Sequence, residues 1–446
     1  MFDKLSLTFF YSFFLFFGIY GYFYASLNDS LSFKFIFFLL LISSYRLFNC
    51  RFEIKKIFYF ILFSFLYLIL ISNLLPPSSY IKLSFTVHSL SFLFLSFLIL
   101  SAYSYISFFE KKNIIIVFFI SIFFISVISI LNFYKIFDKS IFDIFENIPV
   151  VKSKWNTKYY SYWLVFLMWA SFSLSVSRGF SNKILSFLMS LLCVWAVFLT
   201  DAESAQLAIV VSVFFFIILS LERNRYKKYF FSIPFILFLV VPVLWVISPP
   251  VMGILKRYEF LHEIASQIDG VYLRIELYDG VADLIRKKIV TGYGFGSGYN
   301  IPVDTTICSF GGGRLPGGHP HNIVFMALLE QGVFGYCWLV VVMFLLFSFT
   351  CKRILHRPEF PSFSALIISA MIIFSFSFDV WSGDVILLYV MLALLIRIVT
   401  VGTVSCSDAE DEAVFFHSKS AFFVIMVGGT IAYLLNFIFH AGQINF

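Results

Sequence analysis

Charged residues are scarce in this sequence. Asp, Glu, Lys and Arg make up only 13% of the 446 residues, whereas 61% are hydrophobic and 64 are Phe. A soluble globular domain is about half apolar and about a quarter charged. The scarcity of charge therefore excludes a soluble globular protein and predicts an all-α polytopic membrane protein. The first apolar run, from about Leu5 to Ser26, is too long for a signal peptide and has no small-residue cleavage site, so we expect the first transmembrane helix there.

Motifs for bound metals, nucleotides and nucleic acids are also missing. The six cysteines are scattered without a metal-type CxxC spacing, and only Cys308 falls in the largest predicted loop, which therefore has no internal disulfide. The stretch "TGYGFGSG" (291–298) has no P-loop lysine and indicates a tight turn rather than a nucleotide site. No basic stripe with interleaved aromatic residues appears outside the predicted spans. We therefore expect no metal, no other cofactor and no nucleic acid, and membrane lipids as the surroundings.

Long apolar windows predict about 12 or 13 membrane spans, since a helix needs about 20 apolar residues to cross the hydrocarbon core. Nine of these spans fall in 1–248, a large outer loop occupies 249–322, and the C-terminal spans fall in 323–446. The chain is thus one membrane domain with an elaborated outer loop. The windows lie near 5–26, 31–49, 57–75, 83–108, 113–135, 157–177, 182–200, 204–221, 229–248, 323–350, 363–378, 385–402 and 420–440.

The distribution of Lys and Arg orients the spans, because cytoplasmic loops of membrane proteins carry an excess of both. With the N-terminus in the cytoplasm, every predicted cytoplasmic connection is basic, and the short outer connections carry no Lys or Arg. The net charge of +7 largely reflects this pattern. The basic connections are "RFEIKK" (51–56), "EKK" (110–112), "RGFSNK" (178–183), "ERNRYKK" (222–228) and "CKRILHRPEF" (351–360); the outer ones are "LNDS" (27–30), "PPSSY" (76–80), "TDAE" (200–203) and "DVWSGD" (379–384).

The large outer loop carries apolar residues at helical spacing in 253–268 and 272–288, which predicts one or two short helices on the outer face of the membrane. Arg274 opens the second of these helices. A guanidinium has five donors in a planar fork and keeps its charge when partly buried, so this arginine suits a phosphate or diphosphate. The alternative is an ordinary interfacial arginine paired with Glu276 or with a lipid headgroup.

The loop ends in the most titratable cluster of the chain, "RLPGGHPHN" (314–322). Asn322 is a natural N-cap for a helix that begins at Ile323. The free N–H groups and partial positive charge at that helix start attract an anion. His321, which titrates near neutral pH, therefore sits where a lipid-borne phosphate would arrive. A metal site or a packed pair of histidines, His319 and His321, is the alternative, although no third metal ligand is nearby.

Three residues inside the following span also stand out. Glu330 is an acid at membrane depth, where a charge is costly and is functional or paired by default. Gly332 and Gly335 are small residues three apart, which let another helix approach closely. We expect a structural role for the two glycines and a supporting role for Glu330.

His321-Asn322, nine residues, and then Gly332-Val333-Phe334-Gly335 resembles the signature of O-antigen ligases, which is His-(Asn/Ser/Gln), nine residues, Gly-x-x-(Gly/Thr/Tyr). Arg274 matches the arginine early in the family's long periplasmic loop, and "YGFGSG" matches the glycine turn that follows it. The resemblance implies a multi-pass enzyme of the bacterial inner membrane with its active site facing the periplasm. It implies a glycosyltransferase of lipopolysaccharide biosynthesis that moves a glycan from undecaprenyl diphosphate to lipid A-core without metal or nucleotide sugar. By that analogy His321 deprotonates or orients the acceptor hydroxyl, and Arg274 holds the diphosphate leaving group.

One turn departs from the family pattern. Family members often carry Ser-Arg in the short outer turn before the big loop, whereas "TDAESAQLA" (200–208) places Glu203 or Ser204 there. The missing cation can be replaced by Arg314, Lys256 or Arg257. Alternatively, a glutamate in this turn can contact the sugar acceptor. The candidate residues for substrate or diphosphate binding are Arg314, His319, Asn322 and Glu203.

Other activities share parts of this pattern. O-antigen polymerases and protein O-oligosaccharyltransferases of the same family use the same donor lipid. Polymerases tend to have two large outer loops, whereas this chain has one large loop and a modest one at 136–156, which favours a ligase. A lipid-glycan flippase or other transporter places its polar site near the midplane between paired halves, and no such symmetry is present. The motifs of peptidoglycan polymerases of the shape-and-division type do not match.

Overall fold

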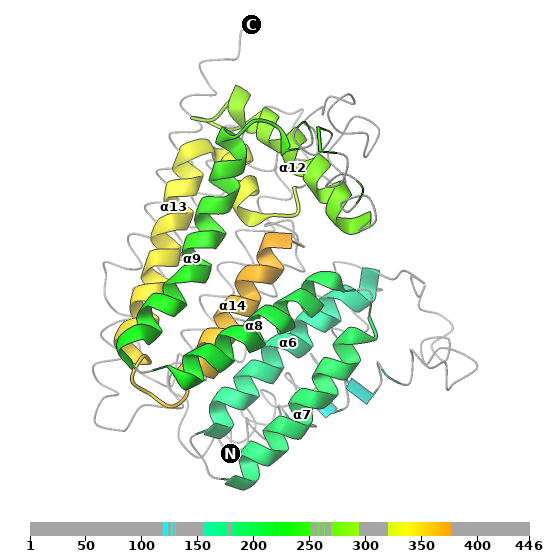
Figure 1. The fold of residues 1–446 in the computed structure, drawn as a ribbon, viewed down its shortest axis with the longest axis vertical. Helices are drawn as coiled ribbons and strands as arrows, with labels where there is room; N and C mark the ends of the chain where they lie inside the picture. Colours follow the sequence, from blue (N-terminus) through cyan, green and yellow to red (C-terminus); the bar gives the residue numbers. More distant parts are fainter. Residues whose placement is uncertain are drawn as a thin grey trace, which may run out of the picture.

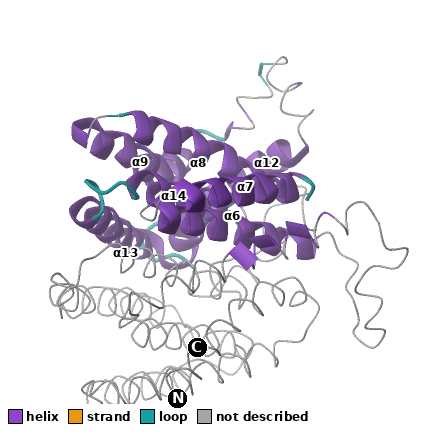
Figure 2. Ribbon diagram, turned by 90° about the horizontal axis from the view of Figure 1, so that it is seen from below, coloured by secondary structure: helices purple, strands orange, loops and turns teal. Residues whose placement is uncertain are grey.

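The computed structural model describes residues 155–176, 180–200, 202–222, 224–251, 269–293 and 320–376, with scattered positions in 119–130 and 253–263. All regular elements in these ranges are α-helices, which confirms the predicted helical class (Figure 1, Figure 2). The first four predicted spans, most of the fifth, the last two and most of the large outer loop lie outside the described residues.

Each apolar window predicted between 157 and 378 coincides with a helix, and so does the amphipathic segment predicted at 272–288. By length and composition, Glu203–Leu221 and Tyr226–Ile247 can cross a membrane, and the bent pair Ile323–Cys337 and Leu339–Lys352 is a third span if counted as one. The helices are α6 (Trp155–Val176), α7 (Phe180–Phe198), α8 (Glu203–Leu221), α9 (Asn224–Ile247), α12 (Asp269–Lys287), α13 (Ile323–Arg353) and α14 (Phe360–Phe376).

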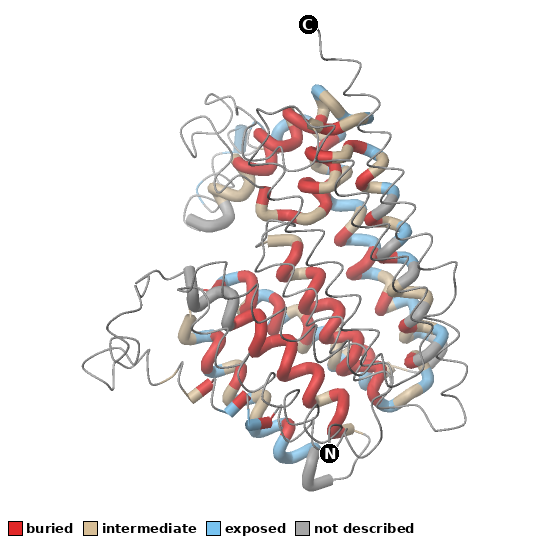
Figure 3. The backbone as a smooth tube through the Cα atoms, turned by 180° about the vertical axis from the view of Figure 1, so that it is seen from behind, coloured by how far each residue is buried: buried red, intermediate tan, exposed pale blue. Residues whose placement is uncertain are grey.

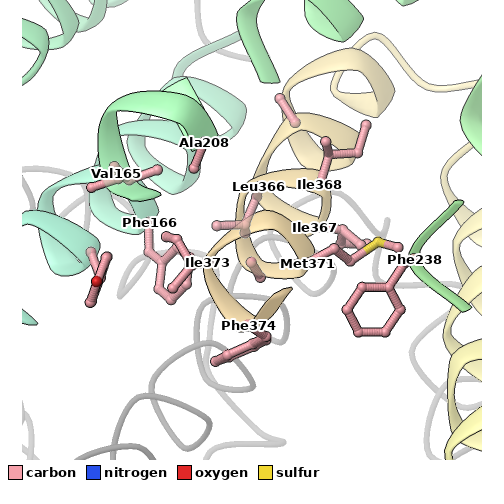
Figure 4. Packing of buried hydrophobic residues seen from close by; sticks show 14 of the residues in the cluster. Val165, Phe166, Ala208, Phe238, Leu366, Ile367, Ile368, Met371, Ile373 and Phe374 are labelled. Atoms are coloured by element: carbon pink, nitrogen blue, oxygen red, sulfur yellow. The ribbon is translucent and has the colours of Figure 1, made fainter. Parts of the chain in front are cut away.

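Helix α14 forms the centre of the described bundle. Residues 360–371 are all buried, because the helix is apolar or small on every side and a helix of that kind is stable only when surrounded (Figure 3). Leu366 and Ile373 face Phe166 on α6, whereas Met371 faces Phe238 on α9 (Figure 4). Helices α6, α8 and α9 therefore all pack against α14.

Helix α6 is joined to three neighbours by hydrogen bonds between side chains. Small polar residues at such contacts let helices approach closely, and each bond contributes about 0.6 kcal/mol in a membrane protein. Several bonds spread along one helix fix its rotation and its height. The pairs are Tyr162 Oη with Ser204 Oγ at 2.9 Å, Trp169 Nε1 with Ser212 Oγ at 3.0 Å, Ser173 Oγ with Ser362 Oγ at 2.9 Å, and Ser175 Oγ with Ser186 Oγ at 2.6 Å.

Candidate active site

Helix α12 lies across one end of the bundle, where α8 and α13 begin and α9 and α14 end (Figure 1). Arg274 near the start of α12 reaches Glu203 at the start of α8. One turn further along, Tyr278 packs against Phe325 of α13, with ring centroids 4.9 Å apart. The ends gathered here are those that the charge pattern assigns to the outer side. The alternation of direction expected for consecutive spans is thus present in this part of the chain.

The C-terminal half of α12 is fixed to the end of α9. Asp279, which is 2% exposed, accepts hydrogen bonds through Oδ1 from Trp245 Nε1 at 2.7 Å and from the Val251 amide at 3.0 Å. Arg286 donates to the carbonyl oxygens of Val246 and Ser248, both at 2.7 Å. A helix end leaves carbonyl groups without intrahelical partners, and a cation there also complements the helix dipole. The C-terminal half of α12 therefore packs on the end of another helix of the protein itself.

Arg274 and Glu203, 71 residues apart in sequence, form an ion pair with Nη1 and Oε2 separated by 3.2 Å. The arginine side chain is 29% exposed and the glutamate side chain is 63% exposed. The guanidinium carbon also lies 6.0 Å from the ring centroid of Phe376, at the end of α14. The cation of the predicted diphosphate site thus lies beside the glutamate that stands where the family often has arginine.

Asn322 caps α13 as predicted. Its Oδ1 accepts hydrogen bonds from the amides of Val324 at 2.8 Å and Phe325 at 3.1 Å, and its Nδ2 donates to the Ser375 carbonyl at 3.0 Å. The Met326 amide donates to the Asn322 carbonyl. Three of the first four N–H groups of the helix are therefore already used. The anion expected at this helix start has to be held mainly by side-chain charge, and direct contact between Asn322 and substrate stays a prediction.

His321 has the only positive φ of any non-glycine residue in the described ranges, at 53°. The left-handed region is uncommon for residues with a side chain, although histidine enters it more readily than most. Such a conformation costs about 1 kcal/mol or more and persists only where the surroundings enforce it. Here the buried Pro320 precedes it and the buried Asn322 cap follows it. The half-buried His321 thus lies in a turn that its buried neighbours hold in place, at the end of the bundle where Arg274 also lies.

Tyr278 connects α12 to the start of α13 through a shared acceptor. Its hydroxyl donates to the Ser375 carbonyl at 3.1 Å, and the same oxygen receives Asn322 Nδ2. Burial raises the pKa of Tyr278 well above its usual range, opposed by the charge of Arg274 and by a hydrogen bond with Asn322, so the phenol remains a neutral donor. Tyr278 is one of the apolar residues at helical spacing in 272–288, and it was not among the candidate site residues predicted from the sequence. The available signal was its hydroxyl, since a buried tyrosine normally finds a hydrogen-bond partner.

The residues inside α13 lie further from this cluster. Glu330 is 1% exposed. Gly332 has φ 61° and ψ −150°, which interrupts the helix. We expected another helix to lie against Gly332. The segment in close contact with it is instead the turn that follows α12, whose Val290 carbonyl faces the position that a side chain at Gly332 would occupy. Arg314, His319 and the remainder of the glycine turn lie outside the described residues.

Residues 188–340 match the family model described as O-antigen ligase. This segment is similar to the O-antigen ligase domain. It runs from α7 into α13 and so includes Glu203, Arg274 and His321. The resemblance to the family that contains O-antigen ligases and polymerases is therefore confirmed. Members of this family are membrane enzymes that transfer glycans in the O-antigen pathway, with lipid-linked glycans as substrates. No curated protein and no solved structure gives a significant match to the chain.

Proposed function

We propose that this protein is an O-antigen ligase. It transfers a glycan from undecaprenyl diphosphate to lipid A-core at the periplasmic face of the bacterial inner membrane, without metal or nucleotide sugar. One observation carries the proposal within the family domain. Arg274 and the start of α13, which His321 precedes by two residues, lie at the same end of the bundle and are linked through Tyr278, Ser375 and Asn322.

The chemistry requires one bond to form and one to break. The acceptor hydroxyl attacks the anomeric carbon of the glycan, and the bond from that carbon to the diphosphate oxygen breaks. His321 takes the hydroxyl proton, and a positioned base of this kind contributes about 10²–10⁴-fold to the rate. The leaving diphosphate gains negative charge, which Arg274 stabilises. Charge stabilisation in a site with little water is often the larger contribution.

Glu203 has a specific place in this proposal. A guanidinium is a planar fork that can donate hydrogen bonds to partners along more than one edge. Glu203 approaches Arg274 through one nitrogen, Nη1. With the donor lipid bound, Glu203 either keeps that nitrogen and orients the arginine toward the diphosphate, or turns to the sugar acceptor. The large exposed fraction of the Glu203 side chain allows both arrangements.

The lipopolysaccharide ladder of a deletion strain tests the proposal and separates it from the related activities. We expect the loss of all glycan-capped core, restored by the wild-type gene. A band of core with a single repeat would instead identify a polymerase, and an unaltered ladder with loss of a glycoprotein would identify a protein O-oligosaccharyltransferase. Purified protein that transfers glycan between lipids in detergent, where no compartments exist, would exclude a flippase.

A further inference from the structure

The turn that follows α12 inserts at the break in α13. In an unbroken helix the Val333 amide donates to the Leu329 carbonyl, four residues earlier. Here the Val333 amide donates to the Ile289 carbonyl at 2.9 Å, and the Leu329 carbonyl accepts the Tyr293 amide at 2.8 Å. One helical hydrogen bond is thus exchanged for two bonds to the turn. The break therefore leaves neither of these two backbone groups without a hydrogen-bond partner, because the inserted segment supplies one for each.

Two glycines make this insertion possible. Gly332 adopts φ 61° and ψ −150°, a region that is essentially restricted to glycine. A Cβ atom at Gly332 would lie 2.2 Å from the Val290 carbonyl oxygen. On the opposite side Gly292 has φ 66°, and a Cβ atom there would lie 2.4 Å from the carbonyl carbon of Glu330. Both clashes are with backbone, which cannot turn aside as a side chain does.

The insertion gives α12 a second point of attachment to α13. The first point is at the site, where Tyr278 and Asn322 share the Ser375 carbonyl. The second is the turn 288–293 against Gly332, which we call the glycine junction. Two attachment points along a rigid helix restrict both its translation and its rotation, whereas one leaves it free to pivot. Arg274 lies on α12, and His321 lies two residues before the start of α13.

We infer that the glycine junction is a positioning element, which sets the place of Arg274 relative to His321 during glycan transfer. The inference rests on the proposed function, because it assumes that these two side chains act on one substrate. The motif spacing indicates only that Gly292 belongs to a turn. In the glycine junction it is as necessary for the close backbone contact as Gly332. A misplacement of about 1 Å far from the reacting atoms can lower a rate about 100-fold. Relief of the backbone clashes above requires a shift of roughly that size, because contacts of 2.2 and 2.4 Å lie well under the 3.0 Å that a Cβ atom needs.

A double-mutant cycle tests the inference with purified, reconstituted protein. We expect Gly332→Ala and Gly292→Ala each to lower kcat at least about tenfold with little change in the KM for donor lipid. Gly253→Ala is the matched control, because a Cβ atom at that exposed glycine has nothing within 4 Å. In an Arg274→Gln background the glycine substitutions should cause almost no further loss, since there is no guanidinium left to misplace. Independent, additive losses in that background, or glycine variants as active as Gly253→Ala, would overturn the inference.

Amide hydrogen exchange on the wild-type protein supplies a readout that needs no activity and no variant. Tyr293 lies in a turn, yet its amide should exchange as slowly as the Val333 amide, because both belong to the glycine junction. Rapid exchange at Tyr293 would overturn the inference even if the alanine variants fail to accumulate. Slow exchange at both amides in a protein that transfers no glycan would leave the junction in place and reject the proposed function instead.

Discussion

Replacement of Arg274 by Lys separates a diphosphate clamp from a surface ion pair. The pair with Glu203 is partly exposed, with side-chain exposures of 29% and 63%. An exposed pair of this kind contributes about 0.2–1 kcal/mol, so its loss explains only a small change in stability or rate. A charge-assisted hydrogen bond contributes about 1.5–3 kcal/mol, and lysine lacks the planar fork that makes two of them at once. With about 1.4 kcal/mol for each factor of ten, Arg274→Lys should lower the rate roughly tenfold to hundredfold, and Arg274→Gln more.

The assay is glycan transfer by reconstituted protein with donor lipids that carry different glycans. The fold reduction should be the same for every glycan, because the contact is to the shared diphosphate. Glu203→Gln serves as the control for the ion pair and should retain most of the stability of the wild-type protein. Thermal unfolding of each variant in detergent separates loss of fold from loss of rate.

The double variant decides between the two roles of Arg274. If Glu203→Gln restores activity to Arg274→Gln, the arginine serves only to neutralise Glu203, and the clamp is refuted. Near-normal turnover by Arg274→Lys refutes it as well. A folded double variant as inactive as Arg274→Gln alone supports the clamp.

Three further predictions follow from the same site. His321→Ala should abolish transfer and leave expression and membrane insertion intact, and near-normal turnover would refute its catalytic role. Asn322→Ala removes the helix cap, worth about 1 kcal/mol of stability, and the hydrogen bond to Ser375, worth about as much again. Asn322→Ser keeps a capping side chain. Thermal unfolding should therefore show a smaller loss of stability for the Ser variant than for the Ala variant. Turnover should survive EDTA and need no ATP, because the sequence has no metal-type ligand spacing and no P-loop lysine; a rate that collapses on chelation and returns with Mg²⁺ or Mn²⁺ would contradict this.

The linear sequence was sufficient for features that depend on neighbouring residues. The helices between 157 and 378 followed from apolar runs, since burial in a membrane requires a continuous stretch of one chain. The cap at Asn322 also followed, because a cap and the amides it accepts are separated by two or three residues. The pairing of His321-Asn322 with Gly332 and Gly335 was visible for the same reason, as a fixed spacing within one segment.

Contacts between distant segments needed the tertiary structure. Arg274 and Glu203 are 71 residues apart, and the sequence also allowed Glu276 or a lipid headgroup as the partner of Arg274. The hydroxyl of Tyr278 reaches a carbonyl 97 residues away, and nothing in its helical spacing indicates which group it meets. Gly332 was expected to face a helix, yet it receives the backbone of residues 289–293. Local preferences fix where a helix begins and which face is apolar, whereas the ends of several helices must be packed together before one polar group can find another.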